Sequence, residues 1–198
     1  KRESAFMSCL HPYFSKVPKP IVFCEDESII GVPFYVMERK QGIVLDVDFP
    51  PGIDYSEEAG RRISCLVADT LAELHTVDYK KAGLETFGYP EGFVQRQVLG
   101  WIKRYERSQT DDIQAFEQIS RWLVNNIPES RVTTIIHNDY KLNNMLLSPD
   151  FTEVTALVDW EMSTIADPIF DLGITIAYWL GPDDSELVRS SMSTLTAK

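Results

Sequence analysis

A polar loop enclosed by short apolar runs is the feature that most constrains how this chain can fold. The loop is His137–Asn144, and the runs are Val132–Ile136 before it, Met145–Leu147 after it and Val154–Val158 further along. Apolar runs of this length, bounded by polar residues, are typical of buried strands. We therefore expect the loop to join two strands, and we expect Asp159 to stand at the end of the third.

The side chains around this loop suit a metal ion and a phosphate. Asp139 and Asn144 lie on the loop, and Asp159 can reach the same strand edge. Carboxylate and carboxamide oxygens are hard ligands that suit Mg²⁺, which usually completes its coordination with water and phosphate oxygens. Phosphoryl transfer to a hydroxyl needs such a metal ion and a carboxylate that orients the attacking oxygen. The pattern thus predicts a magnesium–phosphate site with a spare carboxylate beside it.

Composition limits the function classes that remain. The chain has 198 residues, of which 44% are hydrophobic, so it can bury a core. Its formal net charge of −11 makes nucleic acid and anionic membrane surfaces poor partners, and we expect neither. Cys9, Cys24 and Cys65 form no CxxC pair, which argues against a disulfide framework or a zinc site. With no apolar run of transmembrane length and no signal peptide, a reducing, cytoplasmic location is expected.

The first part of the chain predicts a small strand-bearing unit. Residues 1–10 are typical of the end of a helix, and Pro18 and Pro20 then exclude one. The segments Ile21–Cys24 and Pro33–Glu38 predict two strands that pair as a hairpin. We place a domain boundary at residue 40, so that 1–40 and 41–198 are the two expected units.

The second part predicts mainly helices. The first begins at a capping box formed by Asp54 and Glu57, and Asp111 or Asp112 caps the third. His75, near the end of the first helix, is interpreted as a cap or core histidine. Helical spacing predicts apolar faces at Ile63, Leu66, Val67, Leu71 and Leu74 in the first helix, Val94, Val98, Trp101, Ile102 and Tyr105 in the second, and Ile113, Phe116, Ile119 and Leu123 in the third. The aromatic residues Trp101, Tyr105 and Trp122 are expected in the core.

A further helix is expected after the strands. Asp167 and Pro168 form a favourable helix start, and Ile169–Leu180 follows. This segment is apolar nearly all round, so we expect the helix to be buried. Gly181 and Pro182 end it, and Asp183 or Asp184 begins a final helical stretch.

The loop spacing points to a known family. The loop His137–Asn144 has the spacing of the protein-kinase catalytic loop, and Lys141 falls where that loop carries a lysine. Asp159 falls where those enzymes place a metal-binding aspartate, but the triplet Asp159–Glu161 reads Asp-Trp-Glu instead of Asp-Phe-Gly. The pattern resembles the aminoglycoside phosphotransferase and choline-kinase-like family, in which Asp-Trp-Glu follows such a loop.

The resemblance covers nearly the whole chain and is closest to the acyl-CoA-dehydrogenase-associated branch of that family. The matching segments are Pro33–Arg39, Leu71–His75, Arg96–Gln97 with Trp101 and Tyr105, Trp122–Leu123 with Pro128, and Asp167–Pro168 with Asp171. It implies an α+β, protein-kinase-like two-lobe fold, mostly the helical C-terminal lobe with a remnant of the N-terminal sheet and hinge. It also implies transfer of the γ-phosphate of ATP, with Mg²⁺, to a hydroxyl group of a small molecule.

The same resemblance assigns roles residue by residue. Asp139 would orient the substrate hydroxyl and accept its proton, and Lys141 would contact the transferring phosphate. Asn144 and Asp159 would hold Mg²⁺. The remaining assignments are Glu38, Arg39 and Lys40 for adenine binding through their backbone, His137 and Asp171 for bracing the catalytic loop, and Glu3 for the helix glutamate that pairs with a phosphate-binding lysine.

Two departures from the family pattern carry expectations. Asn138 replaces the usual glycine, and asparagine tolerates unusual backbone angles better than most residues. The glycine-rich phosphate loop and the strand lysine of the family are not found in the sequence and are expected before Lys1, which is not a methionine. We therefore interpret the chain as a fragment or as the ordered part of a longer one.

Other readings stay open at this point. The chain could be a non-catalytic kinase-like module that binds nucleotide or a partner protein, or a metal-dependent hydrolase that uses His137, Asp139 and Asp159. Asn144 could simply hydrogen-bond the loop end, and Lys141 could be a solvated loop lysine. Tyr35 and Met37 are interpreted as core residues. The acceptor pocket is expected between Asp54 and Pro128 and after Leu180, and the branch favours a hydroxylated acyl or small metabolite substrate.

Overall fold

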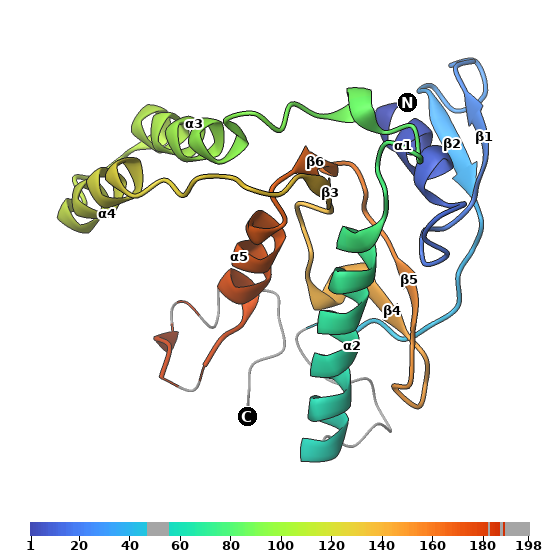
Figure 1. The fold of residues 1–198 in the computed structure, drawn as a ribbon. Coiled ribbons are helices and arrows are strands. Elements are labelled where there is room, and N and C mark those ends of the chain that lie inside the picture. Colours follow the sequence, from blue (N-terminus) through green and yellow to red (C-terminus); the bar gives the residue numbers. More distant parts are fainter. Residues whose placement is uncertain (47–55, 182, 187, 189–198) are drawn as a thin grey trace.

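A computed structural model describes residues 1–46, 56–181, 183–186 and 188 of the chain. A hairpin unit lies beside a larger helical body, and helices α3 and α4 project from it side by side (Figure 1). The hairpin unit holds helix α1 (Arg2–Leu10) and strands β1 (Pro20–Cys24) and β2 (Phe34–Met37), which pair antiparallel with Cys24 opposite Phe34. These three elements confirm the predictions for the first part of the chain.

Helix α2 (Glu57–Thr76) confirms the predicted face but begins at a different cap. The Ser56 hydroxyl accepts a hydrogen bond from the Ala59 N–H, whereas the expected cap Asp54 lies outside the described residues. The predicted buried positions are Ile63, Val67, Leu71 and Leu74, all buried, and Leu66, partly buried. This face packs against the strands that carry the polar loop, so α2 supports the site from behind.

Four short strands carry the polar loop. Strand β3 (Thr134–Ile136) pairs antiparallel with β6 (Thr164–Ala166), and β4 (Met145–Leu147) pairs antiparallel with β5 (Val154–Leu157). The sequence predicted three of them and missed β6, whose single large apolar residue, Ile165, forms no apolar run. The loop therefore crosses from one two-stranded sheet to the other, with a 3₁₀ turn, η2 (Leu142–Asn144), before β4. Another 3₁₀ turn, η1 (Glu85–Phe87), contacts β6.

Trp160 lies at the centre of the core, directly after Asp159. Its side chain is fully buried, its ring stacks on Phe6 of α1 at 6.2 Å between centroids, and its indole N–H donates to the Leu157 carbonyl at 2.7 Å. A buried tryptophan removes a large apolar area from water, and its N–H must find a partner. Trp160 thus joins α1 to the strand end that bears Asp159.

Helices α3 (Phe93–Ser108) and α4 (Gln114–Asn125) form, but their apolar stripes are not core. Trp101, Trp122 and Ile119 are 58%, 62% and 57% exposed, and none of the twelve described residues of α4 is buried. The two stripes contact each other, as the stacked rings of Tyr105 and Phe116 show, and otherwise face solvent. The prediction of core aromatics was wrong at these positions, because amphipathic spacing shows which residues share a face and not what covers it.

The caps and one strand residue also differ from expectation. Neither Asp111 nor Asp112 caps α4, because the cap residue is Ile113, which is 50% exposed and not buried. Tyr35 is partly buried against the core as predicted, but Met37 is 40% exposed. The final helical stretch after Gly181 falls mostly outside the described residues.

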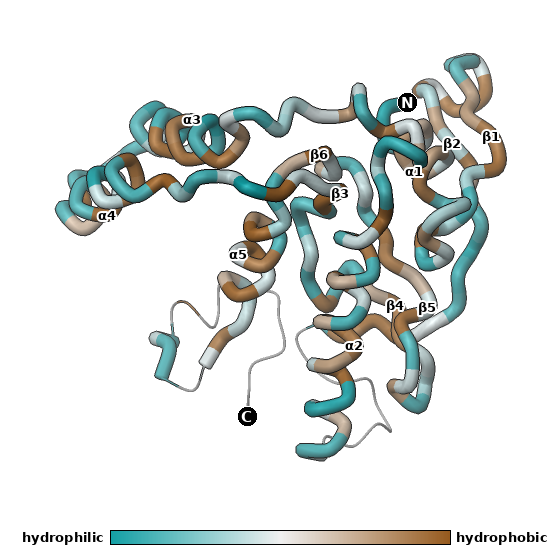
Figure 2. The backbone as a smooth tube through the Cα atoms, in the orientation of Figure 1, coloured by the Kyte–Doolittle hydropathy of each residue, from teal (hydrophilic) through white to brown (hydrophobic). Residues whose placement is uncertain are grey.

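Helix α5 (Ile169–Tyr178) reverses the expected burial. Its apolar residues Ile169 and Ile176 are 53% and 56% exposed, and its buried residues are the polar Asp171 and Thr175. Figure 2 shows hydrophobic residues along α5 and α3. The helix start was predicted correctly, since the Asp167 carboxylate accepts from the Ile169 N–H at 2.9 Å. Within the described residues, no helix is long and apolar enough to cross a bilayer.

Candidate active site

The carboxylate of Asp139 is held at one oxygen and open at the other. Its Oδ2 accepts a hydrogen bond from Asn144 Nδ2 at 2.8 Å and lies 2.9 Å from the ammonium of Lys141. Within the described part of the chain, Oδ1 has no hydrogen-bond partner. The side chain of Asp139 is 16% exposed, so a small molecule can reach it. This geometry presents one oriented carboxylate oxygen to an incoming hydroxyl group.

Val158 is hydrogen-bonded to both ends of the loop, and these bonds fix the position of Asp159, the next residue. His137 Nε2 lies 2.9 Å from the Val158 carbonyl oxygen, and the Val158 N–H donates to the Asn144 carbonyl at 2.9 Å. Because Nε2 faces a carbonyl oxygen, it carries the proton of the neutral ring. Asp159 follows directly, with φ = 66°, a conformation that is costly for a residue other than glycine and that clusters at functional sites.

Asn144 and Asp159 carry side-chain oxygens that could hold a magnesium ion. Asn144 uses its Nδ2 to bind the Asp139 carbonyl and carboxylate, so its Oδ1 remains as a ligand. The exposed Asp159 side chain makes no hydrogen bond within the described part of the chain. No cluster of three or more His, Cys, Asp or Glu side chains that could hold a metal ion occurs among those residues. Two hard oxygens suit Mg²⁺, whose remaining coordination positions are usually filled by phosphate and water oxygens. They do not suit a cation that takes all of its ligands from the protein.

Asp171 of α5 anchors the backbone of the loop from below. Its fully buried carboxylate accepts from the N–H groups of His137 at 2.8 Å and Asn138 at 2.7 Å. The ring of His75, at the end of α2, donates to the same carboxylate at 3.1 Å. Sequence reasoning missed this contact of His75. An aspartate inside an otherwise apolar helix was the available signal, because a buried carboxylate requires donors.

Asn138 adopts the backbone conformation that a glycine would supply. Its φ is 67°, in the left-handed region where asparagine is several-fold enriched over most residues. Its side-chain amide donates to the Met162 carbonyl at 3.1 Å. The substitution thus preserves the loop geometry, as its tolerance of positive φ predicted, and adds a tie to the segment after Asp159.

Lys141 is not a solvated loop lysine. Its side chain is 20% exposed, and its ammonium lies over the ring of Tyr178 at 5.0 Å from the centroid. Burial alone would lower the pKa of Lys141, but the hydrogen bond and charge of Asp139 outweigh it and raise that pKa. The lysine therefore stays charged beside the Asp139 carboxylate at neutral pH. The contact with Tyr178 was not predicted.

Glu3 of α1 also reaches the site. Its Oε1 accepts from the Trp160 N–H at 3.2 Å, next to Asp159. Burial, followed by a hydrogen bond to Glu3, raises the pKa of Tyr35 to about 12. Glu3 therefore bridges strand β2 and the segment that bears Asp159, which is the place expected of the helix glutamate.

The hinge residues Glu38, Arg39 and Lys40 directly follow strand β2. The Glu38 N–H donates to the Lys19 carbonyl at 2.8 Å, and the Glu38 carboxylate pairs with Lys40 at 3.2 Å. Hydrogen bonds from the Lys19 N–H and Lys40 lower the pKa of Glu38. Arg39 is exposed. Within the described residues, the Glu38 carbonyl and the Lys40 N–H make no hydrogen bond.

The buried ring of His137 predicts a pH-dependent stability. Burial lowers the pKa of His137 below its usual value of about 6.5. Protonation then favours the unfolded chain. The contribution of the neutral His137 ring to the free energy of unfolding is therefore fully present above about pH 6.5. It is lost as pH falls, at up to about 1.4 kcal/mol per pH unit for one proton. His137→Gln keeps a donor for Val158 and does not titrate. Urea unfolding at pH 7.5, 6.5 and 5.5 should show the wild type losing its advantage over this variant; a constant difference would contradict the prediction.

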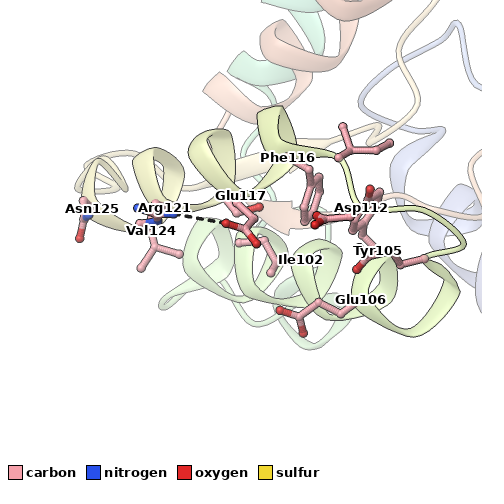
Figure 3. Close-up of a pocket in the computed structure, with 12 residues that line it drawn as sticks. Ile102, Tyr105, Glu106, Asp112, Phe116, Glu117, Arg121, Val124 and Asn125 are labelled. Carbon is pink, nitrogen blue, oxygen red and sulfur yellow. Dashed lines mark hydrogen bonds and ion pairs between the residues drawn. The ribbon is translucent and has the colours of Figure 1, made fainter.

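A separate cleft of about 410 Å³ lies between α3 and α4 (Figure 3). The stacked rings of Tyr105 and Phe116 line it, with Glu106, Asp112 and Glu117 among its polar residues. Arg121 pairs with Glu117 at 3.4 Å. None of the predicted catalytic or metal-binding residues belongs to its described lining, so this cleft is distinct from the site around Asp139.

Comparisons with solved structures identify the fold. A candidate aminoglycoside phosphotransferase from Ralstonia eutropha superposes with a TM-score of 0.81 at 37% identity, over 90% of this chain and 54% of that one. An aminoglycoside phosphotransferase from Streptomyces rimosus, solved with ADP and streptomycin, has a TM-score of 0.57 at 18% identity, over 96% of this chain and 71% of that one. The second likeness shows the fold alone. The chain thus has an α+β, protein-kinase-like fold, mostly the helical lobe with a remnant of the N-terminal sheet and hinge.

Sequence comparisons identify the family. Human acyl-CoA dehydrogenase family member 11 is 36% identical over 182 residues, which are 91% of this chain and 23% of that protein. Mouse acyl-CoA dehydrogenase family member 10 is 36% identical over 190 residues, which are 96% of this chain and 18% of that protein. The chain therefore spans about a fifth of the length of these relatives. The model of the phosphotransferase enzyme family matches residues 1–192, and the chain belongs to that family.

Proposed function

We propose that the protein is an ATP- and Mg²⁺-dependent small-molecule kinase, which transfers the γ-phosphate to a substrate hydroxyl group. The observation that carries this proposal is the carboxylate of Asp139. One of its oxygens is held by Asn144 and Lys141, and the other makes no hydrogen bond within the described residues. A group of this kind can receive a hydroxyl proton at a phosphate-binding edge.

The residues would act in a single displacement. Asp139 Oδ1 would accept a hydrogen bond from the substrate hydroxyl, and it would take up the proton as that hydroxyl oxygen bonds to the γ-phosphorus and ADP leaves. The Mg²⁺ held by Asn144 and Asp159 would neutralise phosphate charge. The Lys141 ammonium, 2.9 Å from Asp139 Oδ2, would stabilise the transferring group from the side of the nucleophile.

Nucleotide binding would use the hinge between the hairpin unit and the helical body. The Glu38 carbonyl and the Lys40 N–H can meet the acceptor and donor edges of adenine. Glu38, Arg39 and Lys40 remain our assignment for the cofactor-binding segment, with the boundary of the two units at residue 40. Solved proteins of this fold include complexes with ADP and with GDP, which supports a nucleotide cofactor.

The acceptor would be a hydroxylated acyl compound or a similar small metabolite. Relatives named as acyl-CoA dehydrogenase family members support this class. Nucleic acid and membrane surfaces remain poor partners for a chain of net charge −11. A hydrolase that uses His137 as a metal ligand is not favoured, because the ring is fully buried and its Nε2 binds the Val158 carbonyl.

The proposal is tested by following the γ-phosphate directly. The full-length protein is incubated with Mg²⁺ and γ-labelled ATP over a panel of hydroxylated acyl compounds, amino alcohols and aminoglycosides. We expect label in at least one acceptor and stoichiometric ADP. In parallel, calorimetry measures Mg-ATP binding. Binding without any labelled acceptor would contradict the proposal and favour a non-catalytic nucleotide-binding module.

A further inference from the structure

The ring of Tyr178 lies against the lysine of the catalytic loop. Tyr178 is the last residue of α5, and its ring centroid is 5.0 Å from Lys141 Nζ. The same ammonium is 2.9 Å from Asp139 Oδ2, and the lysine side chain is 20% exposed. Lys141 therefore contacts a carboxylate and an aromatic ring in a largely desolvated place, where a cation–π contact is stronger than at an open surface.

Helix α5 holds the catalytic loop at two points. Asp171, in its first turn, accepts hydrogen bonds from the backbone of His137 and Asn138, and Tyr178, seven residues on, contacts the side chain of Lys141. These two positions are about 10 Å apart along the helix axis. The backbone of the loop and its charged side chain are thus both held by the same rigid helix, α5.

A lysine side chain has considerable rotamer freedom, and its ammonium is strongly hydrated. If Asp139 were the only neighbour of Lys141, the ammonium could contact the carboxylate oxygen but could also turn towards solvent or towards the charge of Asp159. The Tyr178 ring occupies one side of the ammonium and favours the position beside Asp139. Its hydroxyl makes no hydrogen bond within the described residues, so the ring itself is the group that acts.

We propose that Tyr178 is a positioning residue, which holds the Lys141 ammonium between the catalytic carboxylate and the phosphate in transfer. This inference rests on the proposed kinase function. The ring would act on the lysine and not on the substrate, so its loss should lower kcat and leave the KM for ATP nearly unchanged. A purely structural role would lower the folded fraction and leave the turnover of each folded molecule as it was.

The first test compares three variants of the full-length protein. Tyr178→Leu should lower kcat per nucleotide-binding site about 3- to 30-fold, the range expected for one cation–π contact. Tyr178→Phe keeps the ring and should stay within about 2-fold of wild type on the same scale. Trp179→Leu, at the neighbouring residue that is 54% exposed, is the matched control and should not change kcat. Equal losses in the Leu and Phe variants, or an unchanged kcat in Tyr178→Leu, would overturn the proposal.

A double-mutant cycle shows whether Tyr178 acts through Lys141. In a Lys141→Met background, Tyr178→Leu should cause no further loss of kcat, because the ring has no ammonium to hold. Full additivity of the two losses would overturn the proposal. This arm separates an effect on the lysine from an effect on the shape of the site.

A spectroscopic arm does not depend on turnover. In protein labelled with ¹³Cε-lysine, the Lys141 resonance, assigned with Lys141→Arg, should be shifted upfield by the ring in wild type and in Tyr178→Phe, and not in Tyr178→Leu. An absent shift in wild type would overturn the positioning role. If this shift is present but no acceptor is phosphorylated, the kinase proposal fails while the contact stands, so the two failures are distinguishable.

Discussion

Asp139→Asn should reduce kcat by about 10²- to 10⁴-fold, the usual contribution of a general base, and leave the affinity for Mg-ATP nearly unchanged. The carboxamide keeps the shape of the side chain but cannot accept the hydroxyl proton. The change replaces neither Asn144 nor Asp159, the proposed metal ligands, and the carboxamide oxygen can still accept the hydrogen bond from Asn144 Nδ2. Initial rates with an acceptor found in the labelling experiment give kcat, and calorimetry gives the affinity for Mg-ATP.

Asp150→Asn is the matched control for that change. Asp150 lies in the exposed turn between β4 and β5, where its Oδ1 accepts from the Thr152 hydroxyl at 2.8 Å. It is a loop aspartate of the same chain with the same chemical substitution and no place in the site. We expect its kcat to match that of wild type. A near-normal kcat in Asp139→Asn would remove Asp139 from the mechanism.

Asp171→Ala should lower the free energy of unfolding by about 3–5 kcal/mol, the cost of breaking a buried charged hydrogen-bond network. The change leaves the N–H groups of His137 and Asn138 buried without their acceptor, and His75 loses its partner as well. Such a loss is a large part of the stability of an ordinary domain. Urea unfolding at neutral pH, followed by circular dichroism, measures it.

Leu172→Ala provides the comparison on the same helix. Leu172 is adjacent to Asp171, and its side chain is 44% exposed, so truncation removes little buried surface. We expect a cost below about 1 kcal/mol. If both variants lose the same free energy, the effect belongs to the helix in general and the anchoring role of Asp171 is wrong.

Local sequence predicted most of the secondary structure and the contents of the loop. The strands β1 to β5 and the helices α1 to α5 were recognised, because apolar runs and helical periodicity are properties of neighbouring residues. The loop could be read for the same reason. The spacing of His137, Asp139 and Asn144 within eight residues places them at one strand edge whatever the rest of the chain does.

The burial of the helices could not be predicted in the same way. The stripes of α3 and α4 pack mainly on each other, and Trp101 and Trp122 stay exposed. In α5 the apolar residues Ile169, Leu172 and Ile176 are exposed. The buried positions are Asp171 and Thr175, whose hydroxyl donates to the Tyr140 carbonyl at 3.0 Å. Hydrophobicity alone favoured the opposite arrangement. The polar face is buried because the loop offers it hydrogen-bond partners.

The sequence by itself determined the residues of the proposed site: a carboxylate, a carboxamide, a lysine and a second carboxylate at kinase spacing between short strands. Only the tertiary structure decided what holds them. Glu3 lies 157 residues before Trp160, and His75 lies 96 residues before Asp171, yet each pair is hydrogen-bonded. Contacts over such separations form when distant elements pack around a shared core, and no periodicity within the chain records which elements will meet.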